Sequence, residues 1–137
     1  MKPSRIMLLE AGSGIEMFDE FACPYRLVTP EHESAVRYFV GTSGDGTHLV
    51  STESPEKFRR AMVAHEACCF ELRNTGHCTE AVDFELNFVS SIDRAEYLQL
   101  RKQFFDGLVT FYEGRSGVDQ KFFHGIKQCR DHLHALA

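Results

Sequence analysis

Histidine and cysteine are the residues of this chain best suited to chemistry. The sequence holds seven His and five Cys, and His65, Cys68 and Cys69 lie close together in one segment. Imidazole and thiolate groups bind zinc, and they also act as bases or nucleophiles. His65 with Cys69 has i, i+4 spacing and Cys129 with His132 has i, i+3 spacing. In a helix, each pair would therefore share one face.

These pairs do not predict a metal site. The chain contains no C-x2-C knuckle, and His65-Glu66 is followed by Ala67, Cys68 and Cys69, so the second histidine of an H-E-x-x-H motif is missing. Cys69 and Cys129 fall within apolar stripes, where a free cysteine behaves as a small hydrophobic residue. We therefore expect neither a metal ion nor another cofactor.

Two further motifs carry no catalytic prediction. Cys68, Cys69 and Cys78 lie at or just after the end of a predicted helix, where the negative end of the helix dipole disfavours a thiolate. The glycine-rich run 41–46 lacks the Lys-Ser/Thr that ends a phosphate-binding loop, and a hairpin turn accounts for its glycines.

His65 is the residue that most needs an explanation, because it falls at the centre of an apolar helix face. Phe58, Ala61, Met62, Cys69 and Leu72 share that face. Three interpretations follow. His65 is a core residue hydrogen-bonded to the backbone or to a buried polar partner, it lines an internal cavity as a donor, acceptor or general base, or it lies at a subunit interface.

Asp83 and Glu85 are the other candidates for a site. Apolar residues alternate with polar ones over 81–90, so the pattern predicts a strand with one buried face, and both carboxylates would share its other face. Paired carboxylates in a cavity suit acid–base chemistry, whereas on an open face they are ordinary solvated residues. We take His65, Asp83 and Glu85 as candidate ligand-binding residues.

The second half of the chain predicts three helices around that strand. Ser54-Pro55-Glu56 opens a helix that runs to about residue 74, where Gly76 supplies a stop signal. Helices are also predicted over 92–113 and 117–136. Apolar residues cover about half the circumference of the helix at 92–113, which is more than a contact with one sheet requires.

The first half is harder to interpret. It predicts a short buried strand at 5–9, a short helix at 14–22, a strand at 25–28 and a hairpin across 35–52. Together the patterns predict an α+β fold, with a small antiparallel or mixed sheet, helices packed on one face and a C-terminal helical pair. At 137 residues, we expect 1–137 to form a single domain.

Composition excludes several classes of function. The net charge of −5 and the scattered basic residues argue against nucleic-acid binding. No apolar run approaches the roughly 20 residues of a membrane span, and residues 1–10 lack the apolar core and cleavage site of a signal peptide. The odd number of irregularly spaced cysteines suggests reduced thiols, so we expect a cytoplasmic protein.

Two functions remain open. The first is a small soluble binding or interaction module that forms a homodimer, in which the wide apolar arc of helix 92–113 supplies part of the interface. The second is a small-molecule enzyme or ligand-binding protein with a pocket between helix 55–74 and the sheet, in which His65 is the polar anchor.

Overall fold

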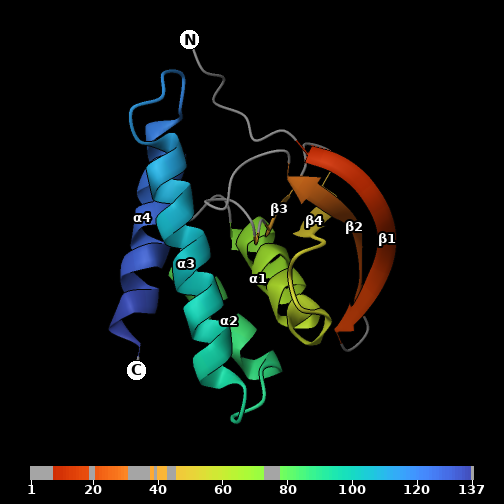
Figure 1. The fold of residues 1–137 in the computed structure, drawn as a ribbon. Coiled ribbons are helices and arrows are strands. Elements are labelled where there is room, and N and C mark those ends of the chain that lie inside the picture. The colour runs from red at the N-terminus through yellow and green to blue at the C-terminus, as the bar shows by residue number, and fades with distance from the viewer. Residues whose placement is uncertain are drawn as a thin grey trace.

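The computed structural model describes residues 8–18, 21–30, 38, 40–42, 46–72 and 78–136. Within these residues, four strands are followed by four α-helices and two short 3-10 turns (Figure 1). The strands are β1 (Leu8–Phe18), β2 (Phe21–Pro30), β3 (Val40–Thr42) and β4 (His48–Ser51). The helical elements are η2 (Glu56–Phe58), α1 (Arg59–Leu72), α2 (Cys78–Glu85), η3 (Leu86–Phe88), α3 (Arg94–Tyr112) and α4 (Gln120–Ala135).

The sheet is mixed, with the strand order β1-β2-β4-β3. β1 and β2 pair antiparallel, β2 and β4 pair parallel, and β3 returns antiparallel against β4. In Figure 1 the helices lie on one side of the curved sheet, with α1 inside the curve and α3 and α4 farther out. The predicted α+β fold, with a small mixed sheet and a C-terminal pair of helices, is therefore confirmed.

The helix predicted at 14–22 is wrong. Residues 14–18 belong to β1 and residues 21–22 to the start of β2, whereas residues 19–20 lie outside the described part of the chain; Ile15 is 63% exposed. Cross-strand packing explains the difference, because the ring of Tyr25 lies over Gly14, where a Cβ atom would come within 2.5 Å of the Tyr25 hydroxyl. Pairing between the two strands of the hairpin thus outweighs a short run of residues with helical spacing.

The other predictions in the first half hold in part. Residues 25–28 lie in β2, and β1 begins at Leu8, although Leu9 is 54% exposed rather than buried. β3 and β4 form the hairpin predicted across 35–52, with Val40 opposite Val50. Residues 5–7, 35–37, 39 and 43–45 lie outside the described part of the chain.

The strand predicted at 81–90 is also wrong, because this segment forms α2 and η3. Ala81, Val82 and Glu85 are buried while Asp83 and Phe84 are exposed, which is a helical pattern of burial. Val82 and Leu86 are spaced i, i+4, so they share a helix face as readily as a strand face. Packing against α1 and α4 selects the helix.

The two C-terminal helices agree with their predicted positions. α4 begins at the cap residue Asp119, whose carboxylate accepts hydrogen bonds from the backbone N–H of Lys121 at 2.8 Å and of Phe122 at 3.2 Å. The buried face of α4 carries Phe123, Ile126, Cys129 and Leu133. The neighbouring Phe122 is 52% exposed.

Arg60 links the β1–β2 hairpin to the helices. Its guanidinium lies 4.9 Å from the ring centre of Phe18 in β1 and 5.1 Å from that of Phe88 in η3. Glu16 of β1 adds an ion pair to Arg60 at 3.9 Å. One side chain of α1 thus holds the inner face of β1 by two cation–π contacts and one charge contact.

We expect Arg60→Met to lower the free energy of unfolding by about 1–2 kcal/mol, because each partly exposed cation–π contact contributes about 0.5–1 kcal/mol. Arg60→Lys keeps the charge but loses the planar stacking group, so its loss should be smaller. Urea denaturation of the two variants and the wild type measures both values. Equal losses in the two variants would contradict a role for ring stacking.

Candidate functional site: a buried polar cluster

His65 lies on the face of α1 that meets α2 and α3. The residue is 3% exposed, and its Nδ1 atom lies 2.9 Å from Oε1 of Glu85. The ring of Phe105 in α3 packs beside the imidazole, with 6.0 Å between the ring centres. The structure therefore gives His65 a buried polar partner, as the first of the three interpretations requires.

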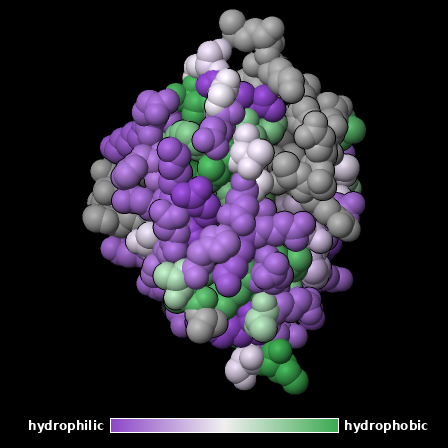
Figure 2. Space-filling view, turned by 60° about the vertical axis from the view of Figure 1, so that its left-hand side comes forward, coloured by the Kyte–Doolittle hydropathy of each residue, from purple (hydrophilic) through white to green (hydrophobic). Residues whose placement is uncertain are grey.

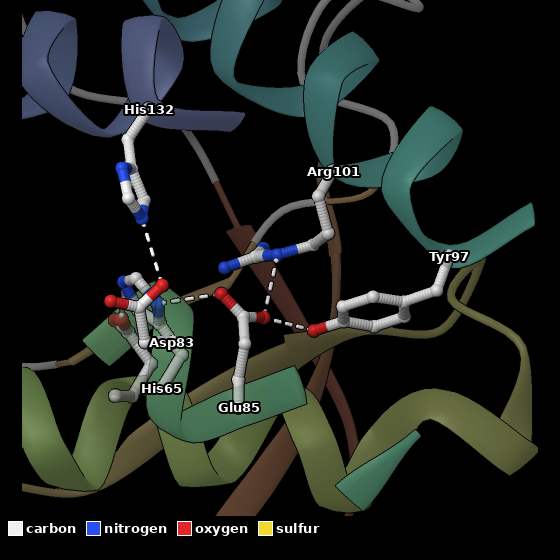
Figure 3. Close-up of polar contacts among 7 residues, drawn as sticks. His65, Asp83, Glu85, Tyr97, Arg101 and His132 are labelled. Atoms are coloured by element: carbon white, nitrogen blue, oxygen red, sulfur yellow. Dashed lines mark hydrogen bonds and ion pairs between the residues drawn. The ribbon is translucent and has the colours of Figure 1, made fainter. Parts of the chain in front are cut away.

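Glu85 is the centre of the cluster (Figure 3). Its side chain is fully buried at the end of α2, and its carboxylate meets groups from two other helices. His65 of α1 contacts Oε1, while Tyr97 and Arg101 of α3 both bond to Oε2. The Tyr97 hydroxyl donates one of these bonds and Arg101 Nε donates the other at 3.0 Å. One carboxylate thus joins α1, α2 and α3.

The charge of Glu85 is stabilised by its neighbours. Burial raises the pKa of Glu85, but the positive charge of Arg101, the electrostatic contribution of His65 and hydrogen bonds from His65 and Tyr97 hold it below the ordinary value. Burial and the nearby Glu85 charge raise the pKa of Tyr97 well above its ordinary value, so its hydroxyl keeps its proton. The cluster therefore contains an ionised carboxylate and a neutral phenol.

An ionised Glu85 decides the tautomer of His65. A carboxylate only accepts hydrogen bonds, so the His65 Nδ1 atom must carry the proton of their shared bond. In a neutral imidazole the Nε2 atom then has a free lone pair. In this tautomer a histidine can act as a base, or bind a ligand, through Nε2.

Arg101 supplies the positive charge that balances Glu85. Its residue exposure is 1%, and its guanidinium lies 5.4 Å from the ring centre of Phe104 and 5.0 Å from that of Phe105. Burial lowers the pKa of Arg101, but the charge of Glu85 and its hydrogen bond, together with smaller contributions from Tyr97 and Glu66, raise that pKa overall. Only Nε bonds to Glu85, and the buried Nη1 atom has no hydrogen-bond partner among the described residues.

Asp83 does not belong to this cluster. In a helix, residues two apart point about 200° apart, so Asp83 faces solvent while Glu85 faces the core. The Asp83 carboxylate pairs with His132 of α4, with 2.8 Å between Oδ1 and Nε2. The predicted sharing of one face by Asp83 and Glu85 is therefore wrong. His134 and Asp106 form a similar surface pair between α4 and α3, at 2.9 Å.

Tyr97 and Arg101 were not predicted as site residues. Arg101 looked like one half of an isolated basic pair with Lys102. A signal was nevertheless present, because Arg101 is spaced i, i+4 from Tyr97 and three and four residues before Phe104 and Phe105. A charged residue at such a position needs a buried partner of opposite charge.

The cysteines lie apart from this arrangement. Among the described residues, Cys23, Cys68, Cys69 and Cys129 form no disulfide bond, and Cys129 is buried in the core. Within the described residues, no group of three or more His, Cys, Asp or Glu side chains is placed to hold a metal ion. Nor does any described helix combine the length and hydropathy needed to cross a bilayer.

Comparison of the chain with protein-family models, curated proteins and solved structures gave no significant match. The chemistry of the cluster therefore has to be argued from its own geometry. Arg101 and Glu85 compensate each other's charge, Tyr97 and His65 complete the hydrogen bonding of the carboxylate, and the cluster fixes how three helices meet.

We expect Glu85→Leu and Arg101→Met each to lower the free energy of unfolding by about 3–5 kcal/mol, because each leaves one buried charge without its partner. The double variant should lose less than the sum, with a coupling of about 1–3 kcal/mol. Chemical denaturation measures the four free energies. The exposed pair Lys57–Glu96, 3.1 Å apart, is the control, and Lys57→Met with Glu96→Leu should show little coupling.

The lowered pKa of Glu85 also predicts that the fold is sensitive to acid. Its pKa in the folded protein lies below the ordinary value of 4.5, so its contribution to stability is full above about pH 4.5. That contribution is lost as the pH falls from 4.5 through the lower folded pKa. The unfolding free energy of the wild type should therefore drop on acidification more steeply than that of Glu85→Gln. Parallel pH profiles for the two proteins would contradict this assignment.

Proposed function

We propose that the protein is a small binding module that associates with a second copy of itself through β1. The observation that carries the proposal is the exposed edge of the sheet. β1 is eleven residues long and ends the strand order, and no strand of the described residues pairs with its outer edge. Such an edge presents unpaired N–H and C=O groups that can bind another strand.

The outward face beside this edge is apolar. Ile15 is 63% exposed and Met17 is 49% exposed, and their cross-strand neighbours Pro24 and Ala22 are exposed as well. Lysine and proline, which commonly protect an edge strand, are absent from β1. A second chain at this edge would remove Ile15 and Met17 from water, which favours association.

A second copy fits the edge by symmetry. A two-fold axis at Ile15 would place Ile15 opposite its own copy, Met17 opposite Ser13, and Glu16 opposite Gly14 in an antiparallel pair. This register places no glutamate directly opposite another; the two copies of Glu16 are diagonal neighbours, and each also pairs with the Arg60 of its own chain. The paired segment is short, so we infer a weak dimer that forms at about 10–100 µM.

The α3 helix does not offer the apolar surface on which a helical interface was expected. Eight of its residues are buried within the chain: Tyr97, Leu98, Arg101, Phe104, Phe105, Leu108, Val109 and Phe111. Packing against α4 and the rest of the core accounts for its wide apolar arc. Its exposed positions include Gln103 and Thr110, which are polar.

Reduced cysteines support a place for this module in the cytoplasm. Cys23, Cys68, Cys69 and Cys129 form no disulfide bond, as expected of a protein from a reducing compartment.

Small-molecule chemistry at His65 is the second candidate function. The contact of Glu85 with His65 Nδ1 favours this function, because Nε2 is then the atom that can bind a ligand or accept a proton. Because His65 faces α2 and α3, its ligand would reach it from the side of the helices rather than from the sheet.

We expect Ile15→Lys/Met17→Lys to make the protein monomeric at about 50 µM, because lysines at a strand edge oppose pairing. Gln103→Lys/Thr110→Lys adds the same charge to the exposed side of α3 and should leave the dimer intact. Sedimentation velocity measures the mass of each, and circular dichroism checks the fold. A monomeric wild type, or dissociation by the α3 pair alone, would overturn the proposal.

Figure 2 shows a second view of the surface, in which hydrophilic residues predominate and apolar ones form small separate areas.

A further inference from the structure

The inner face of β1 includes two glycines at the free edge of the sheet. Residues 12, 14, 16 and 18 form this face and are half-buried, whereas residues 13, 15 and 17 are exposed. Gly12 and Gly14 have no side chain of their own, and side chains of β2 cover both positions. Leu27 lies opposite Gly12, and Tyr25 lies opposite Gly14. Part of the edge surface of β1 is therefore supplied by β2.

Tyr25 brings a hydroxyl group to this edge. A Cβ atom on Gly14 would lie 2.5 Å from Tyr25 Oη and 2.6 Å from Tyr25 Cζ, so the end of the phenol ring fills the space of a β1 side chain. Tyr25 is half-buried, and its hydroxyl forms no hydrogen bond with another described residue. A phenol hydroxyl at the sheet edge thus remains available as a donor.

Glu16 is the acceptor that the same face offers. Its Oε2 atom lies 3.9 Å from Arg60 Nη1, which is close enough for an ion pair but longer than a hydrogen bond. The Glu16 side chain is 23% exposed and makes no hydrogen bond to another described residue. Because a carboxylate can accept about four hydrogen bonds, Glu16 has capacity for a donor from outside its own chain.

Pairing of β1 with a second copy brings these two groups together. With the two-fold axis at Ile15, Glu16 of the partner subunit lies directly opposite Gly14. Opposite residues of an antiparallel pair have their Cβ atoms about 4.5–5.5 Å apart. The Tyr25 hydroxyl lies where the Cβ atom of a residue at position 14 would be, so it is within reach of that carboxylate. By symmetry, the dimer contains this arrangement twice.

We propose that the Tyr25 hydroxyl donates a hydrogen bond to Glu16 of the partner subunit, and that this contact sets the register of the dimer. The inference rests on the proposed pairing of β1, and it names the side chains that make the pairing specific. The two copies of Glu16 are diagonal neighbours in that pairing. A hydrogen bond from Tyr25 and the charge of Arg60 stabilise each carboxylate beside the other.

Two neighbouring registers lack this contact. An axis at Glu16 would place the two Glu16 carboxylates directly opposite each other, which is destabilising. An axis at Gly14 would place Glu16 of the partner subunit opposite Gly12. There the nearest side-chain atom is Leu27 Cδ1, 3.6 Å from the position of a Cβ atom, and it offers no hydrogen-bond donor. Of these three axes, the one at Ile15 gives Glu16 a donor and avoids placing like charges directly opposite each other.

Removal of the hydroxyl alone is the first test. Tyr25→Phe keeps the ring over Gly14, and we expect the dissociation constant of the dimer to rise at least about ten-fold, because two hydrogen bonds to charged groups are lost. Tyr112→Phe is the matched control, since Tyr112 is a half-buried tyrosine of α3, and it should leave the constant unchanged. Sedimentation velocity over a concentration series measures these constants, and circular dichroism checks the fold of each variant.

Mixed dimers test whether the contact runs between chains. A Tyr25→Phe chain and a Glu16→Ala chain each form homodimers without the bond, whereas their heterodimer keeps one copy of it. In the control mixture, the Tyr25→Phe chain is combined with the double variant Tyr25→Phe/Glu16→Ala. That heterodimer has the same charges but no bond. Energy transfer between labelled chains should show at least about three-fold more heterodimer in the first mixture.

The outcomes separate this inference from the proposed dimer. A wild type that is monomeric at about 100 µM would overturn both. A dimeric wild type whose dissociation constant is the same in Tyr25→Phe, or equal amounts of heterodimer in the two mixtures, would overturn the contact between Tyr25 and Glu16 and leave the dimer standing.

Discussion

The carboxylate of Glu85 is the constraint on which the helical half of the protein depends. An ionised group without water must find its hydrogen bonds and its counter-charge within the protein. Here they come from three side chains on two other helices, His65, Tyr97 and Arg101. A shift of α1 or α3 by one turn would remove these partners. The cluster therefore acts mainly on specificity, because a well-packed apolar core of equal volume could be as stable.

Part of the site could be predicted from the sequence. His65 stands out because an ionisable side chain at the centre of an apolar stripe requires a partner. Glu85 was selected as well, but from a strand pattern, and its actual role follows from the helical geometry of α2. Within 81–90, Val82 and Leu86 fit both the two-residue repeat of a strand and the i, i+4 spacing of a helix. The pattern alone therefore could not separate helix from strand. Tyr97 and Arg101 were hidden because sequence spacing shows which residues share a helix, but not which helices meet.

The same limit explains the first half of the fold. The α-helices at the C-terminal end follow from local periodicity and caps, and these were predicted within a few residues. β1 and β2 instead depend on contacts across the hairpin, such as Tyr25 over Gly14. β2 also pairs parallel with β4, which lies more than twenty residues away. Interactions of that range leave little trace in a short window of sequence.

The attachment of the hairpin through Arg60 has a consequence for how this sequence can change. The polar cluster lies among α1, α2 and α3, whereas Arg60 meets Phe18 and Phe88 outside it. Substitutions on the outer face of β1 and β2 therefore touch neither the buried charges nor their partners. The chain is therefore divided into a helical half, in which the four positions of the cluster constrain one another, and a hairpin whose outer face can change without disturbing them. New binding preferences can arise on that hairpin at small cost to the fold.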